Sequence, residues 1–219
     1  MKVVLTATEV SAGPLADALA AEGFEVETCS LVAVEPLPGP PLRAAEYDWL
    51  VLTSRNAVEP LLERLEGALP RVAVVGPGTA EALRARGVEP ELVAAVSTQE
   101  GLAAELPRPA GSVLFAGAEG ARDVLVRELG ADFVPLYRTV GLRPERFPAA
   151  DLVVLASPSA ARSFAALGLD LPCVSIGPGT SAEAWALGLR VVAEAVSHDR
   201  EGLVRAVKLA ASTVGSSPF

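Results

Sequence analysis

The chain of 219 residues is long enough for one large domain or two small ones, and 51% of its residues are hydrophobic. No apolar run reaches the roughly 18 residues of a membrane-spanning helix, and a formal net charge of −9 argues against nucleic-acid binding through a basic surface. The two cysteines, Cys29 and Cys173, give no disulfide framework and fit a reducing cytoplasm.

A strand, a helix and a second strand open the chain. Lys2–Thr6 is apolar and predicts a strand, Pro14–Glu22 predicts a helix that ends at Gly23, and Glu25–Cys29 predicts another strand. The same order returns later, at residues 112–116, 121–129 and 131–136. We therefore interpret residues 1–34 and 111–142 as two copies of a small unit, each too small to bury both faces of its strands.

A longer repeat covers residues 48–106 and 151–207. The tetrapeptide Gly76–Thr79 recurs 101 residues later as Gly177–Thr180, and Glu100–Leu102 recurs at the same distance as Glu201–Leu203. A fixed distance over a long stretch indicates two related folding units. The run Trp49–Thr53 is almost wholly apolar, as in parallel strands that are buried on both faces. These patterns predict an α/β fold with two doubly wound parallel-sheet domains.

The four segments can combine in two ways. Neighbours along the chain can pair in order, or the middle two can form an inserted domain while the chain ends form the other. Ser30–Val34 and Tyr137–Gly141 are β-prone and each leads to a proline, so they can pair as an antiparallel ladder where the chain leaves and returns. This favours the second arrangement. We expect a discontinuous domain of residues 1–34 and 142–212, an inserted domain of residues 36–139, and a disordered tail of residues 213–219.

The loops at the carboxyl ends of the strands are the expected binding surface, because open parallel sheets bind ligands there. Nearly all of them carry Gly, Ser, Thr or Asn where a helix begins, and such a start offers free N–H groups to an anion. In any single loop, helix capping is enough to explain these residue types. If all the loops converge on one cleft, the whole set favours a ligand-binding role. The loops are Thr6–Gly13, Thr53–Asn56, Gly76–Thr79, Ser97–Glu100, Gly117–Gly120, Ser157–Ser159, Gly177–Thr180 and Ser197–Arg200.

The repeated Gly-Pro-Gly-Thr segments are the most specific local feature. Proline presets φ, and the glycine after it lets the backbone approach a ligand closely. Thr79 and Thr180 can each cap a helix and present a hydroxyl group. We expect no metal site, because His198 is the only histidine, and we expect His198 to be a surface residue.

The sequence shows no nucleophile with a credible base, so an enzyme of this kind must act on an intrinsically reactive substrate and mostly position it. Tyr137 is one of only two tyrosines and lies beside Arg138 on the expected ladder. Facing the cleft, its phenol can donate a proton to a leaving group. The alternative interpretation is an aromatic residue that packs the hinge.

Six segments, in order, resemble the uroporphyrinogen-III synthase family. They are Leu52–Val58, Val75–Ala80, Leu114–Gly117 with the following loop at Arg122, Leu136–Val140, Ala156–Ala160 and Ile176–Thr180. The resemblance implies two flavodoxin-like α/β domains joined by a two-stranded β-ladder, one inserted in the other. It implies a cytoplasmic, monomeric hydro-lyase of tetrapyrrole biosynthesis that uses no cofactor and converts hydroxymethylbilane to uroporphyrinogen III, with loss of water and inversion of ring D.

The implied chemistry agrees with the residues. The substrate supplies its own electrophile and nucleophile, and its eight carboxylates suit many helix N-termini. By resemblance, Tyr137 assists loss of the hydroxyl group. The resemblance also implies binding roles for Thr79, Thr180 and Ser157. Together with the loops at the strand ends, it gives the candidate substrate-binding residues Ser54, Arg55, Asn56, Gly76, Thr79, Thr98, Gly117, Arg122, Ser157, Ser159, Gly177, Thr180 and Ser197.

Two other functions compete with the synthase. A non-catalytic, two-lobed binding module for an anionic small molecule or a tetrapyrrole would keep the cleft and the helix N-termini without turnover. A regulatory doubly wound domain would need an acidic cluster with one phosphorylatable aspartate at the strand ends, and the loops at the strand ends lack such a cluster.

Overall fold

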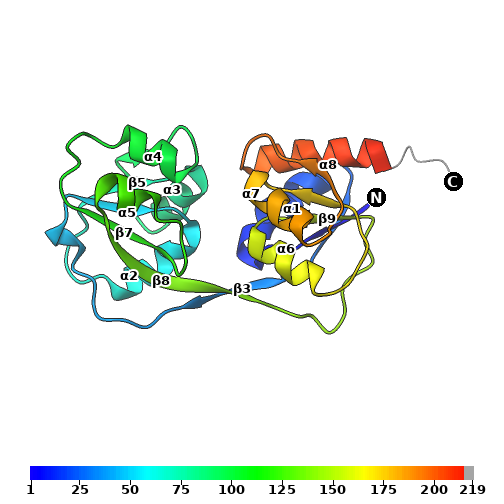
Figure 1. The fold of residues 1–219 in the computed structure, drawn as a ribbon, viewed down its shortest axis with the longest axis horizontal. Helices are drawn as coiled ribbons and strands as arrows, with labels where there is room; N and C mark the ends of the chain where they lie inside the picture. Colours follow the sequence, from blue (N-terminus) through cyan, green and yellow to red (C-terminus); the bar gives the residue numbers. More distant parts are fainter. Residues whose placement is uncertain (215–219) are drawn as a thin grey trace. The chain divides into compact units, whose positions relative to one another are not determined.

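The computed structural model describes residues 1–214, apart from the side chains of residues 9–11 and 214. The chain divides into two compact units (Figure 1). Unit 1 contains Met1–Ala33 and the residues from Val140 onward, and unit 2 contains Val34–Thr139. The chain therefore crosses from one unit to the other twice.

Unit 1 contains a five-stranded sheet in the order β11-β10-β9-β1-β2. All four neighbouring pairs are parallel, and the central strand β9 pairs with β1 through Leu152 and Val3. The strands are β1 (Lys2–Leu5), β2 (Glu25–Thr28), β9 (Leu152–Leu155), β10 (Cys173–Ser175) and β11 (Val191–Glu194). The helices are α1 (Glu9–Ala21), α6 (Pro158–Ala165), α7 (Pro178–Ala186) and α8 (Arg200–Val214).

Both faces of this sheet are covered, because alternate residues of the apolar strands enter different cores. Val154 packs in a cluster with residues of α1 and α8, whereas Val153 and Leu155 pack in a cluster with residues of α6 and α7. The four residues of β9 are at most 1% exposed. Polar and apolar residues do not alternate along β9, because both of its faces are buried.

A six-stranded sheet in the order β3-β8-β7-β4-β5-β6 belongs to unit 2, except that the first two residues of β3 and the last two of β8 fall in unit 1. The strands are β3 (Val32–Pro36), β4 (Trp49–Leu52), β5 (Arg71–Val74), β6 (Leu92–Val93), β7 (Val113–Ala118) and β8 (Asp132–Gly141). The helical segments are η1 (Ala44–Glu46), η2 (Arg55–Ala57), α2 (Val58–Arg64), α3 (Pro77–Arg84), α4 (Gln99–Glu105) and α5 (Val124–Leu129). β7, β4, β5, β6 and β8 pair in parallel, so the predicted parallel α/β class is confirmed in both units.

The sheet of unit 2 is also covered on both faces. Leu50 and Leu52 of β4 pack in a cluster with residues of α2 and α3, and Trp49 and Val51 pack in a second cluster with residues of α4 and α5. All four side chains are at most 1% exposed. Because η2, α3, α4 and α5 each follow a parallel strand directly in the chain, their first turns lie on the side of the carboxyl ends of the strands.

The two crossings of the chain are the neighbouring strands β3 and β8. Leu142 donates its N–H to the carbonyl of Leu31, and Leu37 donates to the carbonyl of Leu136, each at 2.8 Å. From the first of these hydrogen bonds to the second, the residue number rises on the β3 side and falls on the β8 side. The two segments therefore run antiparallel. β8 is a single strand of ten residues, Asp132–Gly141, and joins the two segments that the sequence analysis treated separately, 131–136 and 137–141, except for residue 131.

Three helices differ from the sequence prediction at their ends, and the first is α1, which begins at Glu9 rather than at Pro14. α5 begins at Val124 rather than at residue 121. α8 continues to Val214, so residues 213 and 214 are helical although they were assigned to the disordered tail. The remaining tail, residues 215–219, lies outside the described residues. Over the part of the chain that the structure describes, no helix is long and apolar enough to cross a membrane.

Candidate functional site

The carboxyl edge of the unit 2 sheet is formed by the loops that follow β4, β5 and β6. Ser54 precedes η2, and its Oγ accepts a hydrogen bond from the N–H of Asn56 at 3.2 Å. Thr98 precedes α4, and its Oγ1 accepts from the N–H of Gly101 at 3.0 Å. Gly76 precedes α3 without a side-chain cap. The edge therefore presents two capped helix starts and one open start.

Tyr137 lies in the interior of unit 2 and is only 4% exposed. The sequence analysis placed its ring on an open cleft, and the structure buries it in an apolar cluster with Leu50, Leu52 and Leu136. The cause is a bulge, because Gly117 pairs with Pro135 while Ala118 pairs with Tyr137. The extra residue disrupts the alternation of β8, and both Leu136 and Tyr137 are buried.

The phenol of Tyr137 is hydrogen-bonded to the side chain of Ser54, which follows the carboxyl end of β4. Burial raises the pKa of Tyr137 because the phenolate would lose its hydration, and the hydrogen bond with Ser54 acts in the opposite direction. The phenol therefore keeps its proton at neutral pH. The edge of unit 2 holds one protonated, hydrogen-bonded phenol next to a helix start.

The first glycine turn, Gly76–Thr79, is covered by two polar side chains. A Cβ added at Gly76 would lie 2.8 Å from Oγ of Ser97, and one added at Gly78 would lie 2.8 Å from Nη2 of Arg55. Arg55 also lies 3.9 Å from Glu81 of α3. Gly76 is thus closely packed by Ser97, whereas the flexible end of Arg55 could move away from Gly78. The sequence analysis included Ser97 in a strand-end loop but did not select it as a ligand.

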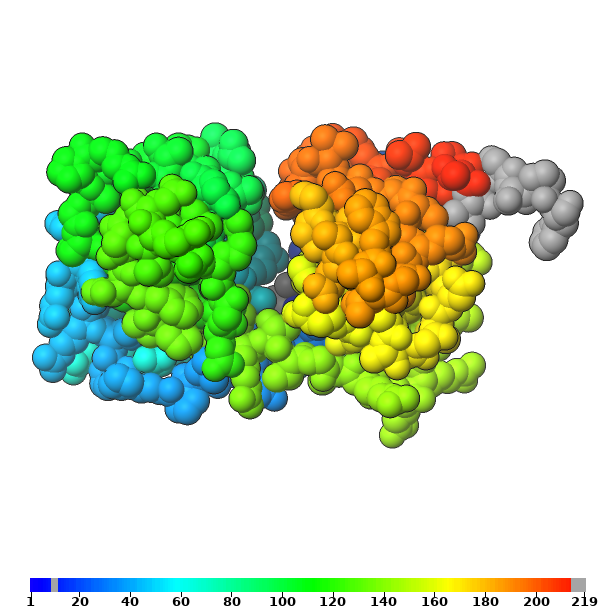
Figure 2. Space-filling model, viewed as in Figure 1, coloured from blue at the N-terminus to red at the C-terminus, as the bar shows by residue number. Residues whose placement is uncertain are grey.

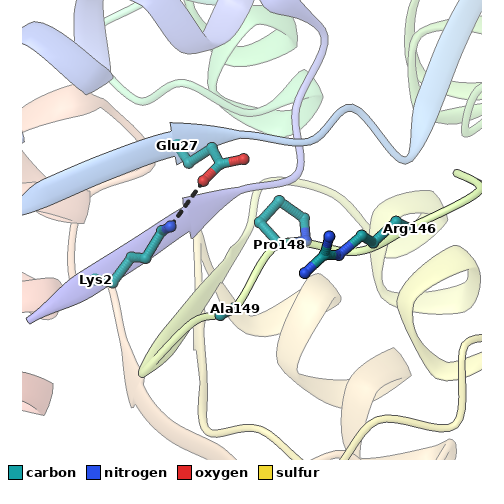
Figure 3. Close-up of a pocket in the computed structure, with 5 residues that line it drawn as sticks. All are labelled: Lys2, Glu27, Arg146, Pro148 and Ala149. Atoms are coloured by element: carbon teal, nitrogen blue, oxygen red, sulfur yellow. Dashed lines mark ion pairs between the residues drawn. The ribbon is translucent and has the colours of Figure 1, made fainter.

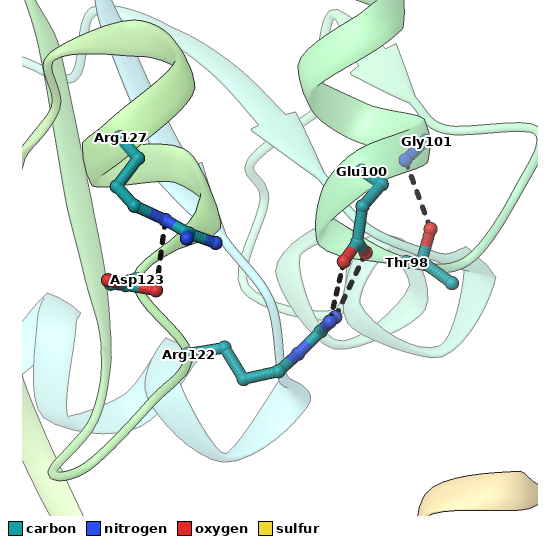
Figure 4. Close-up of polar contacts among 6 residues, drawn as sticks. All are labelled: Thr98, Glu100, Gly101, Arg122, Asp123 and Arg127. Atoms are coloured by element: carbon teal, nitrogen blue, oxygen red, sulfur yellow. Dashed lines mark hydrogen bonds and ion pairs between the residues drawn. The ribbon is translucent and has the colours of Figure 1, made fainter.

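Arg122 and Glu100 form a two-bond ion pair at the same edge (Figure 4). Their N–O distances are 2.6 and 3.0 Å. Hydrogen bonds from Arg122, supported by a backbone N–H at Glu100 and by Thr98, lower the pKa of the Glu100 carboxyl. The charge of Arg122, a predicted ligand of the substrate, is therefore compensated by Glu100. Both side chains are at least 50% exposed, and such a pair is weak enough to be exchanged for an anionic ligand.

The carboxyl edge of unit 1 contains the starts of α6, α7 and α8. Oγ of Ser157 accepts from the N–H of Ala160 at 3.1 Å, as expected of a cap. Oδ1 of Asp199 accepts from the N–H of Gly202 at 2.7 Å, and this bond is the main cause of the lowered pKa of Asp199. Ser197, a predicted ligand, instead donates to Oδ1 of Asp199 at 2.9 Å and accepts from Arg205 at 3.2 Å.

Asp199 is a residue that the sequence reasoning missed, although the repeat contained the signal. Thr98 and Asp199 are 101 residues apart, the same distance that separates the two glycine turns, and each caps the helix that follows it. The same spacing relates Ser97 to His198. His198 lies against Gly177, where its ring occupies the space that a Cβ would take, just as Ser97 lies against Gly76.

Thr79 and Thr180 do not cap their helices. Each is the third residue of its helix, and the cap positions belong to Gly76 and Gly177. The two threonines are 6% and 3% exposed, respectively. The reason is that the Gly-Pro pair begins each helix two residues before the threonine, which turns its side chain toward the interior.

Two other predicted ligands also have different surroundings from those expected. Gly117 lies within β7 rather than in the loop after it, and a Cβ there would lie 3.0 Å from the ring of Phe115. Ser159, in the first turn of α6, accepts a hydrogen bond from Arg162 at 3.0 Å. Neither observation requires a ligand.

The second glycine turn, Gly177–Thr180, begins α7, which is part of the orange segment at the surface of unit 1 (Figure 2). Behind it, Oγ of Ser175 and Oγ of Ser181 lie 2.5 Å apart, and Ser181 also donates to Glu194. Both serines are fully buried. This chain of hydrogen bonds connects α7 to β10 and β11.

Two hollows of the surface contain none of the predicted ligands. One pocket in unit 1, of about 300 Å³, is lined by Lys2, Glu27, Arg146, Pro148 and Ala149, and Lys2 forms an ion pair with Glu27 at 2.9 Å (Figure 3). Lys2 begins β1, so this pocket is at an amino end of a strand. A pocket in unit 2, of about 330 Å³, is lined by Gly39, Pro41, Glu63, Arg64, Leu65 and Glu66. Among the side chains that the structure describes, no three of His, Cys, Asp or Glu form a group that could hold a metal ion.

Comparison with known proteins identifies relatives over most of the chain. The family described as uroporphyrinogen-III synthase HemD matches residues 13–205. A uroporphyrinogen-III synthase from Synechococcus elongatus is 29% identical, and the match covers 75% of each chain.

Two solved structures share the fold of this chain. The uroporphyrinogen-III synthetase of Helicobacter pylori superimposes with a TM-score of 0.69 at 19% identity, covering 97% of this chain and 99% of that one. A mutant uroporphyrinogen III synthase from Thermus thermophilus gives a TM-score of 0.58 at 16% identity, with the same coverage. At these identities the structures show a shared mixed α/β fold with parallel sheets.

Proposed function

Because the chain belongs to the uroporphyrinogen-III synthase family, we propose that it cyclises hydroxymethylbilane to uroporphyrinogen III, with loss of water and inversion of ring D. The observation that carries this proposal is the family match across residues 13–205, which includes both glycine turns and Tyr137. The family resemblance that the sequence motifs predicted is confirmed by this match. The chain is an enzyme of the cyclising lyase type.

Tyr137 is the proposed proton donor for the first step. Its pKa is raised by burial, so the phenol is protonated at neutral pH, and its hydrogen bond with Ser54 orients the hydroxyl group. As the C–O bond of the hydroxymethyl group breaks, the phenol proton passes to the departing oxygen, which leaves as water. The substrate becomes an azafulvene-type cation and the phenol becomes a phenolate.

The later steps need positioning more than functional groups. The substituted carbon of ring D attacks the cationic carbon and forms a spiro intermediate, which fragments and closes again with ring D inverted. The proton that ring closure releases balances the proton that the phenol donated. Because the electrophile and the nucleophile belong to the same molecule, the protein accelerates these steps mainly by holding the chain in a reactive conformation.

The substrate carboxylates are proposed to bind at the carboxyl edges of both sheets. Helix starts with free N–H groups favour anions, and the edges of the two units carry several of them. In unit 2 the proposed contacts are Ser54, Arg55, Asn56, Gly76, Thr79, Thr98, Gly117 and Arg122. In unit 1 they are Ser157, Ser159, Gly177, Thr180 and Ser197. The close packing of Arg55 on Gly78 supports a role for this arginine beside the first glycine turn.

The two units are proposed to be the two domains of the enzyme, one inserted in the other, with β3 and β8 as the connecting ladder. The hydrogen bonds of Leu31 with Leu142 and of Leu37 with Leu136 support the ladder. We further propose that the enzyme is a monomer in the cytoplasm, where free cysteines such as Cys29 and Cys173 stay reduced. Small-angle scattering tests the domain proposal, because closure on the product lowers the radius of gyration, whereas one rigid body leaves it unchanged.

The proposed reaction is tested by adding freshly prepared hydroxymethylbilane and separating the cyclised isomers. The synthase gives the type III isomer, faster than the spontaneous closure that yields type I. Type I alone, at the rate seen without protein, rejects the synthase. If the product still raised the melting temperature in that case, the chain would be a binding module without turnover.

A further inference from the structure

Three hydrogen-bonded side chains lie behind the second glycine turn. Ser175 is the last residue of β10, Glu194 is the last residue of β11, and Ser181 lies in the first turn of α7. Oγ of Ser181 lies 2.5 Å from Oγ of Ser175 and donates to the carboxylate of Glu194. A hydroxyl group has a single hydrogen to donate, so Ser181 accepts from Ser175. These three side chains, the polar chain of unit 1, therefore run in one direction, from Ser175 to Glu194.

The polar chain connects the interior of unit 1 to its surface. Ser175 and Ser181 are fully buried, whereas Glu194 is exposed. Each buried hydroxyl donates to a neighbour, which offsets the loss of its bonds to water. If the acceptor at Glu194 were lost, the two hydroxyl groups could donate only to each other, and one hydrogen would be left without a partner. Glu194 thus fixes the orientation of both serine side chains, although it lies at the surface.

Unit 2 forms the same junction without polar side chains. The residues 101 positions earlier are Val74 at the end of β5, Ala80 in the first turn of α3 and Val93 at the end of β6. All three pack in or against one apolar cluster. Buried polar groups are often no more stabilising than apolar side chains that fill the same space. The polar chain is therefore a feature of the second turn and not a requirement of the fold.

The outer sides of the two glycine turns also differ. A Cβ added at Gly78 would meet the guanidinium of Arg55 at 2.8 Å, whereas one added at Gly179 would meet none of the described atoms within 4 Å. Arg55 also approaches Glu81 of α3, so it contacts the first turn and its helix from outside. The second turn is open over Gly179 and is tied from behind through Ser181, whose N–H also donates to the carbonyl before the helix.

We propose that Ser175, Ser181 and Glu194 are positioning residues for substrate binding, which hold the first turn of α7 in place while its outer side stays open. This inference rests on the proposed function, in which the second glycine turn binds a substrate carboxylate. Glu194 acts through Ser181 and does not touch the substrate. A turn that is already fixed loses less conformational freedom when the ligand binds, so the ligand binds more tightly.

Two neutral replacements of Glu194 separate positioning from charge. Glu194→Gln keeps an oxygen that accepts from Ser181, and Glu194→Val, which gives unit 1 the residue of unit 2, removes the acceptor. We expect the KM of Glu194→Val to exceed that of Glu194→Gln about tenfold, as on weakening one hydrogen bond to a substrate carboxylate, with equal kcat. Loss of a negative charge alone would lower the KM for an anionic substrate equally in both variants, since both lose the same charge.

A second background tests whether Glu194 acts through Ser181. In Ser181→Ala the polar chain is already broken, so Glu194→Val and Glu194→Gln should have the same KM when added to it. Glu22→Val is the matched control, because it also removes an exposed carboxylate from unit 1, where Glu22 pairs with Lys208 of α8. It should keep the KM of the wild type. All rates are measured well below the melting temperature of each variant.

Each outcome decides between the proposals. If the wild type makes the type III isomer and the two Glu194 variants have equal KM, the positioning role is wrong and the synthase stands. If their difference persists in Ser181→Ala, Glu194 does not act through Ser181 and the proposal is overturned. If the wild type makes no type III isomer, the synthase proposal fails. The Kd of the same variants for uroporphyrin III, the stable oxidised product, then decides the positioning role, and an equal Kd overturns it.

Discussion

Replacement of Tyr137 by phenylalanine separates its proposed chemical role from its packing role. The ring remains in the apolar cluster of unit 2, and only the hydroxyl that bonds to Ser54 is removed. Loss of one such hydrogen bond costs about 1 kcal/mol, which lowers the melting temperature of a chain of this size by about 2–4 °C. Loss of a general acid lowers kcat by roughly 10²–10⁴-fold. We therefore expect a large fall in kcat, a small change in KM and a nearly unchanged melting temperature.

The chain offers a matched control, since Tyr47 is its only other tyrosine. Tyr47 also belongs to unit 2, packs against the same apolar cluster and donates its hydroxyl to Asp132 at 3.0 Å. Tyr47→Phe should lose a similar amount of stability and keep the wild-type kcat. The assay is the rate of type III formation from fresh hydroxymethylbilane, with the spontaneous type I product quantified in the same chromatogram.

Two results would refute the reasoning about Tyr137. Wild-type kcat in Tyr137→Phe would mean that the phenol proton is not used. An equal loss of kcat in Tyr47→Phe would mean that activity follows the packing of the cluster rather than the Tyr137 hydroxyl.

Three further predictions concern other parts of the chain. Glu100→Gln should lower KM several-fold by releasing Arg122, and an unchanged KM would show that Arg122 does not meet the substrate. In the wild type this pair is present at neutral pH and is lost only as pH falls below the usual carboxyl range, because Arg122 lowers the pKa of Glu100. Burial raises the pKa of Cys173 to about 12. A colorimetric thiol reagent at pH 8 should therefore label Cys173 only after denaturation. Rapid labelling of two thiols in the folded chain would contradict the burial of Cys173. Gly202→Ala forces a Cβ onto the carbonyl of Ser197 and should reduce the free energy of unfolding by about 1–3 kcal/mol. Gly13→Ala in α1 should cause no such loss, because a Cβ there meets nothing within 4 Å. Urea unfolding measures the stability of both variants.

The elements of the fold that depend on local pattern could be predicted from the sequence. The run Trp49–Thr53 indicated a strand buried on both faces, and β4 places Leu50 and Leu52 in one core and Trp49 and Val51 in the other. The spacing of 101 residues related the two glycine turns, and both turns begin helices after parallel strands. These features follow from periodicity and turn chemistry, which short stretches of sequence contain in full.

Features that depend on irregular geometry could not be predicted. The burial of Tyr137 comes from the bulge opposite Gly117 and Ala118, which changes the face of one residue and leaves no mark in the apolar pattern. The same irregular region keeps Gly117 inside β7 rather than in a loop.

Contacts between side chains that are far apart in the sequence could not be predicted from the sequence pattern either. Arg122 meets Glu100 only because the loop after β7 and the start of α4 lie together at one edge (Figure 4). Ser181 meets Glu194 because α7 lies over β11. Placement of these charges requires the packed structure, since no spacing rule connects them.

A crystal structure of the enzyme with uroporphyrinogen III tests most directly whether the carboxyl edges of the sheets form the substrate site. We predict product carboxylates at the starts of α3 and α7. Product carboxylates bound instead in the pocket of Lys2 and Arg146, at the amino end of β1, would contradict the account (Figure 3).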